Sequence, residues 1–181
     1  MPAEPRAFEL QPVLEGRLLL LRPLEPGDFD ALHAAASDPL IWEQHPEPDR
    51  WTPAGFRRYF DGAIVSGGAF AVLERATGRL VGSSRYDHLK PEASEVEIGW
   101  TFLERRLWGG EYNREMKALM LEHAFRFVER VVFVVGDDNL RSQKALTKIG
   151  ARFVGPTGDD LRDHRVVFEI ARADYRDPRE Q

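Results

Sequence analysis

The sequence predicts one domain of the α/β (α+β) class, with helices packed on a mixed β-sheet, and three observations favour this class. The chain of 181 residues, 43% of them hydrophobic and 30% charged, is long enough for one well-buried core and short for two. Strand-like and helical patterns follow one another in the order strand, helix, helix, three strands, helix, strand, helix, strand. The sequence shows no internal repeat and no low-complexity linker. We therefore treat 1–181 as a single domain with loose ends at about 1–12 and 174–181.

The first half of the chain predicts a strand, two helices and a three-stranded meander. Residues 16–24 (GRLLLLRPL) form a run too short for a buried helix and typical of a strand. Residues 26–38 carry apolar side chains at helical spacing, and 52–68 open with an N-capping Thr52 and close with two glycines, so each predicts a helix. From 69 onward the period changes to that of strands. These three expected strands are 69–74, 79–89 and 95–102.

The second half predicts two helices and two further strands. Residues 111–128 place Met116, Leu119 and Met120 on one broad apolar face, so this helix is expected to pack against the sheet. A short β-branched run and a capped helix follow, and a last strand ends the domain. Their expected ranges are 130–135, 137–151 and 165–171.

Composition excludes several classes of function. A net charge of -5 and a pI near 5.6 give no large positive field for a nucleic-acid backbone or an anionic membrane, so we expect neither partner. No segment is apolar and long enough to span a bilayer, and 1–11 lacks the apolar core of a signal peptide, so we expect a cytoplasmic protein. The chain has 0 Cys, which excludes disulfides, zinc-thiolate sites and thiol nucleophiles. The scattered histidines predict no metal site.

Two adjacent glycines, Gly109 and Gly110, stand where the long helix should begin, shortly after Arg105 and Arg106. The free N–H groups of a helix start lie beside a partial positive charge, and glycine lets an oxyanion approach the backbone. This junction therefore suits a phosphate or pyrophosphate. A tight strand-to-helix turn with solvated arginines explains the same residues equally well. Neither a P-loop nor a Gly-x-Gly-x-x-Gly pattern is present, which disfavours a dinucleotide fold.

Two stretches resemble a known family. Residues 96–125 (VEIGWTFLERRLWGGEYNREMKALMLEHAF) and 139–155 (NLRSQKALTKIGARFVG) are similar to the coenzyme-A motif and the second conserved motif of GNAT-superfamily N-acetyltransferases, in particular the RimJ/RimL-like branch. The resemblance extends over about 14–170. It implies a mostly antiparallel central sheet, flanked by about four helices and splayed between its fourth and fifth strands, here 95–103 and 131–135. It also implies acetyl-CoA as co-substrate, bound in that gap without a metal.

The resemblance also assigns cofactor contacts. The expected contacts are Phe102, Leu103, Arg105, Arg106, Trp108, Gly109, Gly110, Glu111, Tyr112, Asn113, Asn139, Ser142 and Lys144. The first two would meet the pantetheine amides through their backbone, and the backbone of 108–113 would meet the pyrophosphate. Asn139 would contact pantetheine, Ser142 would lie near the thioester sulfur, and Lys144 would approach the 3'-phosphate, although a solvated lysine is the simpler explanation. Glu111 departs from the Gly or Ala of the family signature, so we expect its side chain to face solvent.

Acetyl transfer to an amine needs a neutral nucleophile, a nearby thioester and an acid for the departing thiolate. Without cysteine, direct attack in a ternary complex is the simpler route. Glu95, Glu97 and Gly99 share one face of their strand, which taken alone is an ordinary solvent-facing row. Because the family often places its base on this strand, the resemblance makes Glu97 the candidate base and Glu95 the reserve.

Ser142 precedes the apolar stripe of Ala145, Leu146 and Ile149, so it is expected to face inward. A buried hydroxyl bonded to its own helix would explain it without a function. Many relatives carry a tyrosine acid where Leu146 stands. Ser142 or a water molecule must then protonate the thiolate, or the thiolate leaves unprotonated.

The acceptor pocket is expected from 38–51, where Trp42 and Trp51 could form a wall and Glu43 or His45 could bind an ammonium; packing or surface roles explain them equally well. The resulting hypothesis is an acetyl-CoA-dependent N-acetyltransferase, monomeric or homodimeric, acting on a protein N-terminal amine or a small amino compound. A non-catalytic acyl-CoA-binding sensor of the same fold is the alternative. A nucleic-acid-binding domain is disfavoured by charge.

Overall fold

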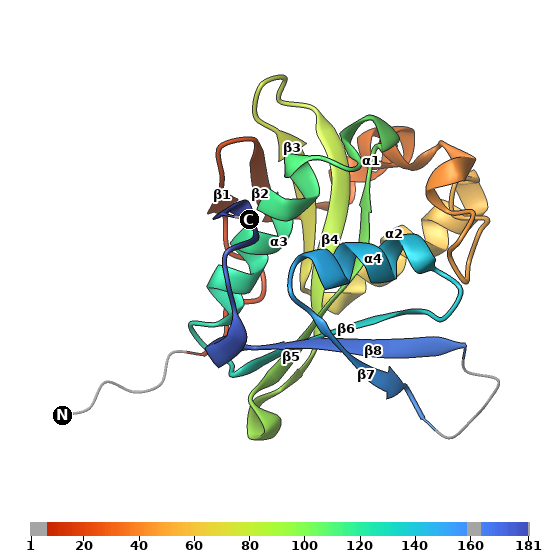
Figure 1. Ribbon diagram of the computed structural model, residues 1–181. Coiled ribbons are helices and arrows are strands. Elements are labelled where there is room, and N and C mark those ends of the chain that lie inside the picture. The colour runs from red at the N-terminus through yellow and green to blue at the C-terminus, as the bar shows by residue number, and fades with distance from the viewer. Residues whose placement is uncertain (1–6, 159–163, 181) are drawn as a thin grey trace.

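The computed structural model describes residues 7–158 and 164–180 and contains one eight-stranded sheet within them (Figure 1). The strands are β1 (Leu14–Glu15), β2 (Leu19–Pro23), β3 (Ala69–Glu74), β4 (Leu80–Lys90), β5 (Glu95–Leu103), β6 (Arg130–Gly136), β7 (Arg152–Pro156) and β8 (Arg165–Ala171). The α-helices are α1 (Phe29–Ala36), α2 (Pro53–Ser66), α3 (Glu111–Ala124) and α4 (Leu140–Lys148). Strand order is β1-β2-β3-β4-β5-β6-β8-β7, antiparallel throughout except for the parallel pair β5 and β6. The predicted mixed, mostly antiparallel α/β fold is confirmed.

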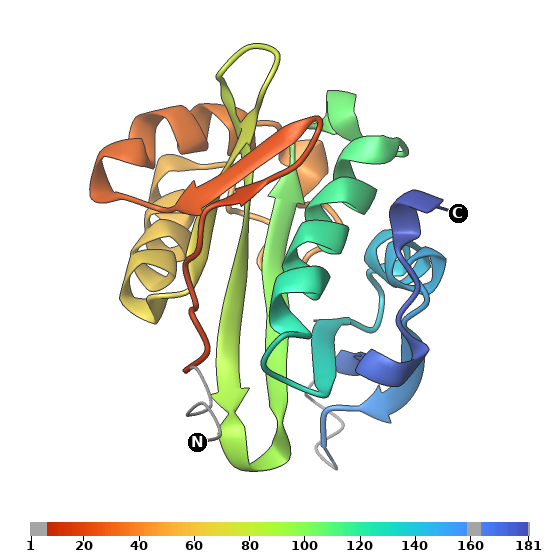
Figure 2. The same ribbon diagram turned by 90° about the vertical axis from the view of Figure 1, so that its left-hand side faces the viewer.

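The sheet has a hydrophobic core on each face, because alternate residues of the fully covered strand β3 enter different clusters. Phe70 and Val72 pack in one cluster with Met116 and Met120 of α3. The other cluster takes Ala69 and Ala71 together with residues of α1 and α2. Figure 2 shows the result, with α1 and α2 on one side of the long strands and α3 on the other. Such burial on both faces explains why β3 reads as a continuous apolar run.

Helix α3 is fixed to the first hairpin by a buried carboxylate. Glu115 accepts hydrogen bonds from the backbone N–H groups of Arg17 at 2.9 Å and of Leu18 and Leu19 at 2.8 Å each. Gly16 lies so close that a Cβ there would come within 2.5 Å of this carboxyl group. These charge-assisted bonds place the start of α3 firmly beside the sheet.

The predicted helix signals are mostly confirmed. Thr52 caps α2 by accepting from the Gly55 N–H at 3.1 Å, and Gly67 and Gly150 have the left-handed φ values of 66° and 88° expected after a helix. The predicted end of the long helix is wrong, because α3 stops at Ala124 and the chain then turns. Strands β1 and β7 were not predicted: β1 has only 2 residues, and β7 is a largely exposed strand without the apolar alternation of a core strand.

The predicted splay of the sheet is present between β5 and β6. These strands pair only at Glu95 with Arg130, Val96 with Val131 and Glu97 with Val132. Beyond Glu97, β5 continues along β4 while β6 continues along β8, so the two strands separate; Figure 1 shows β6 and β8 running across the direction of β4 and β5. A β-bulge at Trp100, whose φ is 51°, increases the divergence.

The chain ends are better packed than we expected. Phe8 makes ring contacts with Tyr86, His123 and Phe127 at centroid distances of 5.2, 5.5 and 5.3 Å. Near the other end, Arg179 forms ion pairs with Glu122 and with Asp177. Residues 7–12 and 174–180 are therefore held by hydrophobic and ionic contacts, which corrects the prediction of loose ends there. The other residues of the two predicted ends lie outside the described part of the chain.

Candidate active site

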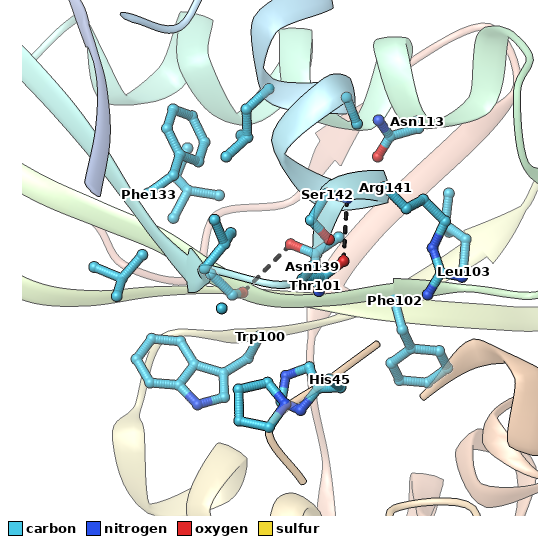
Figure 3. A pocket seen from close by; sticks show the side chains of 18 of the residues that line it. His45, Trp100, Thr101, Phe102, Leu103, Asn113, Phe133, Asn139, Arg141 and Ser142 are labelled. Atoms are coloured by element: carbon cyan, nitrogen blue, oxygen red, sulfur yellow. Dashed lines mark hydrogen bonds between the residues drawn. The ribbon is translucent and has the colours of Figure 1, made fainter. Parts of the chain in front are cut away.

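A cavity of about 740 Å³ occupies the gap between β5 and β6 (Figure 3). Its walls come from β4, β5, β6, the first half of α3, α4 and the segment 41–50. Eight predicted site residues line it: Glu97, Phe102, Leu103, Trp108, Gly109, Asn113, Asn139 and Ser142. Six others do not contribute to its lining: Arg105, Arg106, Gly110, Glu111, Tyr112 and Lys144. Residues far apart in the sequence thus meet where the sheet opens.

The start of α3 borders this cavity through Gly109 and Asn113. Gly109 has a φ of 70°, a conformation that favours glycine, and the N-cap residue Gly110 provides no side-chain hydrogen bond to the first turn. The preceding Trp108 is fixed because its indole donates to the Leu103 carbonyl at 3.0 Å and Arg141 stacks on its ring at 4.1 Å. A fixed, uncapped helix start of this kind suits an anion.

The two arginines before the glycines pair with carboxylates in this structure. Arg106 forms two hydrogen bonds of 3.0 Å to Glu74, which lower the pKa of Glu74 to about 2. Arg105 forms an ion pair with Asp38. Their predicted contacts with a cofactor stay predictions, as does that of the exposed Lys144.

The two residues that follow Gly110 also turn away from the cavity. The Tyr112 hydroxyl donates to Glu74 at 3.1 Å. Glu111 pairs with Arg17 at 2.8 Å and its side chain is 65% exposed. The prediction that the Glu111 side chain faces solvent is confirmed, and its pairing with Arg17 reduces its repulsion of an anion at the helix start.

Helix α4 supplies the opposite wall. The Asn139 side chain caps this helix by accepting from the Ser142 N–H at 3.2 Å, which orders the first turn. Gln143 supports the same turn, because its side-chain amide donates to the carbonyl groups of Gly136 at 3.0 Å and Asp137 at 2.9 Å. Figure 3 shows Asn139 and Ser142 across the cavity from Trp100. The predicted inward position of Ser142 is confirmed.

Glu97 forms a pair with a histidine that the sequence did not single out. His88, on β4, has a φ of 46° and places its Nδ1 at 2.6 Å from a carboxylate oxygen of Glu97. Burial raises the pKa of Glu97, and the bond to His88 opposes that rise. Both side chains line the cavity, and the His88 side chain is 61% exposed toward solvent. An accessible imidazole that is oriented by a buried carboxylate is a suitable proton acceptor.

Glu95 has a different role from Glu97. Both are buried, so the explanation as a solvent-facing row is wrong. Glu95 forms ion pairs with Lys90 at 2.9 Å and with Arg130 at 2.8 Å, and it does not line the cavity. Its carboxylate joins β4, β5 and β6 at the end where they pair.

Of the four residues expected at the acceptor side, two line the cavity. Trp42 is buried, with its indole donating to the Ala36 carbonyl at 2.8 Å, and His45 lies beside it. Burial lowers the pKa of His45 to about 3, with a smaller contribution from nearby Arg50, so the imidazole is neutral at pH 7. Trp51 is exposed and Glu43 lies 3.8 Å from Arg141, and neither lines the cavity.

Comparison with protein families identifies the class to which this fold and site belong. Residues 18–152, more than half of the chain, match the family model of the acetyltransferase (GNAT) domain. The chain therefore belongs to this family, whose members transfer acetyl groups and use acetyl-CoA. Comparison with curated protein sequences gives no match.

Solved structures show the same fold. A GCN5-related N-acetyltransferase from Brucella melitensis has a TM-score of 0.80 and 23% identity, with 97% of this chain and 86% of that chain covered. A GNAT-family acetyltransferase from Bacillus anthracis has a TM-score of 0.70, 20% identity and coverage of 88% and 98%. Mycobacterium smegmatis RimJ, solved in complex with CoA-disulfide, has a TM-score of 0.67, 16% identity and coverage of 90% and 86%.

The described residues contain neither a metal site nor a membrane-spanning helix. No group of three or more His, Cys, Asp or Glu side chains there could bind a metal ion. None of the helices in that part of the chain is long and apolar enough to cross a membrane.

Proposed function

We propose that this protein is an N-acetyltransferase that moves the acetyl group of acetyl-CoA to a primary amine by direct attack in a ternary complex. The observation that carries this proposal is one cavity that joins an uncapped helix start to the His88 and Glu97 pair. The first suits the phosphates of a donor, and the second suits the proton of an acceptor amine.

The residues present fit coenzyme A. Beyond Glu97, the β5 edge that faces β6 has no partner strand, so backbone groups on this edge can pair with the amides of an extended pantetheine arm near Phe102 and Leu103. The Leu103 carbonyl already accepts from the Trp108 indole, so the arm would share or replace that bond. The Trp108 N–H already donates to the Arg105 carbonyl at 3.0 Å, so the helix-start amides from 109 to 113 are those that suit the pyrophosphate. Asn139 and Ser142 form the facing wall. The cofactor's thioester supplies the activated acetyl group.

His88 acts as the proton acceptor in this proposal, which moves the base from Glu97 to its partner. The bond from Nδ1 to Glu97 fixes the ring and leaves Nε2 to take the proton of the attacking amine. The Glu97 carboxylate stabilises the imidazolium that results. We expect Ser142 or a water molecule to protonate the departing thiolate, because Leu146 supplies no acidic group.

The acceptor class is inferred from the motifs and from the cavity wall. The motifs of 96–125 and 139–155 resemble the RimJ/RimL-like branch, and the RimJ structure shares the fold. We therefore propose a protein N-terminal amine as acceptor, with a small amino compound as the second candidate. Trp42 and His45 form the wall on the α1 and α2 side of the cavity, where either amine would enter.

Release of free CoA, followed with a thiol reagent across a panel of N-terminal peptides and small amines, tests the proposal. Wild type should release CoA with at least one amine. His88→Ala should lower kcat about 100-fold, within the range for loss of an acid–base group. The matched control is His164→Ala, which removes an exposed histidine from outside the cavity. Absence of turnover with every amine would contradict the enzymatic proposal.

One observation favours the alternative of a non-catalytic sensor. Leu146 stands where many relatives carry a tyrosine that acts as the acid. The departure from the family signature at Glu111 does not separate the two candidates, because that side chain points outward. A sensor predicts that CoA raises the Tm while no amine accelerates CoA release. The two assays together separate the candidates.

A further inference from the structure

Lys117 of α3 is a buried ammonium in the wall of the cavity. The residue is 5% exposed, and it lines the space between β5 and β6. Its Nζ donates to the Thr101 hydroxyl at 2.9 Å and lies 5.4 Å from the centroid of the Phe133 ring. No carboxylate of the described residues forms an ion pair with it.

These partners satisfy the ammonium only in part. A hydroxyl oxygen and an aromatic face attract a cation, but neither carries a compensating charge. The Thr101 hydroxyl also shares a hydrogen bond of 2.7 Å with Ser84, so its capacity is divided. Burial lowers the pKa of Lys117 to about 7, with no charged group contributing to the shift. A cation of this kind is stabilised when an anion enters the cavity.

The position of Lys117 within the cavity indicates which part of a ligand would reach it. Phe133 follows directly after the last β6 residue paired with β5, and Thr101 lies just beyond the bulge, so Nζ stands near the closed end of the gap. The start of α3 is about 10 Å away along the helix axis, at 1.5 Å per residue. A donor with its phosphates at the helix start therefore has an arm long enough to bring its acyl end to Lys117.

Lys117 and the proposed acceptor wall belong to elements that pack on opposite faces of the sheet. Lys117 comes from α3, which packs with the core on one face. Trp42, on the proposed acceptor side, packs with α1 and α2 on the other face. A carboxylate attached to the acyl chain therefore reaches the ammonium more directly than a carboxylate attached to the amine.

We propose that Lys117 binds a carboxylate at the end of the acyl chain, so that the protein prefers short dicarboxylic acyl-CoA donors of the malonyl or succinyl type over neutral donors of the same length. This inference rests on the proposed function for the site and the transfer step, and it replaces acetyl-CoA by a dicarboxylic acyl-CoA as the preferred donor. The amine nitrogen bonds to the thioester carbonyl carbon, the C–S bond breaks, and the CoA thiolate leaves as the amine gives up its proton. The terminal carboxylate is unchanged in the product.

Calorimetric titration with CoA, butyryl-CoA and freshly prepared succinyl-CoA tests the inference. The two thioesters have four-carbon chains that differ in a terminal methyl or carboxylate group. Wild type should bind succinyl-CoA about tenfold more tightly or better, as expected for a charge-assisted hydrogen bond. Lys117→Met should lose this preference while still binding butyryl-CoA. Lys148→Met, which replaces an exposed lysine outside the cavity, should retain it.

Each result has a distinct meaning. If CoA itself does not bind, the proposed function fails. If CoA and butyryl-CoA bind wild type and succinyl-CoA shows no advantage, the inference is wrong and the proposed function stands. The inference is also overturned if Lys117→Met keeps the preference, or loses turnover equally with acetyl-CoA and succinyl-CoA, as a partner of the thiolate would. A preference that follows the carboxylate of the amine instead, in turnover assays with acceptors that carry or lack one, would assign Lys117 to the acceptor.

Discussion

The buried ammonium of Lys117 predicts an unusual dependence of stability on pH. Its pKa falls from the ordinary 10.5 to about 7 in the folded chain. Between these values the unfolded state binds more protons than the folded state, so the free energy of unfolding rises with pH. At 1.36 kcal/mol per pKa unit, we expect Lys117 to contribute a gain of about 3 kcal/mol from pH 7 to pH 9.5. Below pH 7 both states carry the charge and this gain is absent.

Replacing the lysine with methionine should remove the effect. Lys117→Met has a similar length, lacks the charge and fills an apolar space, so the variant should be more stable than wild type at pH 7 and differ less at pH 9.5. Urea unfolding followed by circular dichroism at both pH values gives the two differences in free energy. Lys148→Met controls for loss of a surface lysine. Equal pH dependence in wild type and Lys117→Met would refute the reasoning.

Two glycine predictions follow from the backbone. Gly109→Ala should lower stability by about 1 kcal/mol, because the left-handed conformation is strained for any L residue and no atom lies near the new methyl group. It should also weaken CoA binding in a titration, whereas Gly78→Ala, with the same φ of 70° in a distant turn, should cause only the loss of stability. Gly68→Ala should destabilise by about 1–3 kcal/mol, since its Cβ would stand 2.0 Å from the Tyr86 carbonyl oxygen. Urea unfolding measures this, with Gly62→Ala on the open surface of α2 expected to be neutral or slightly stabilising; a Gly68→Ala variant as stable as wild type would contradict the clash.

Much of the fold could be predicted from the sequence because its signals are local. Thr52 and Gly67 mark the ends of α2 through hydrogen bonds and dihedral angles that involve only neighbouring residues. Gly109 and Gly110 likewise indicate, from the sequence alone, a helix start without a side-chain cap. Strand β7 could not be predicted, because it is an exposed edge strand and its sequence lacks the apolar alternation that indicates a strand.

The site could be predicted only in part, because its chemistry depends on register. The pairing of β4 and β5 shifts between Ser83 and Arg85 and again between Asp87 and Lys90, so the approach of His88 to Glu97 follows from two irregularities that alternation cannot locate. Lys117 is a different case. It lies in a helix whose residues 115–121 are all buried, and a lysine in a helical pattern is ordinarily assigned to the solvent side.

The short parallel contact between β5 and β6 has a consequence for the folding of the whole chain. Within the sheet, three residue pairs connect strands β1 to β5 with strands β6 to β8, and side chains from both groups of strands share the core beneath α3. A donor molecule bound between β5 and β6 would contact both groups of strands and so add interactions between them. Binding of coenzyme A would then stabilise the folded state. A destabilised variant of this protein would accumulate to a higher level when coenzyme A is abundant than when it is scarce.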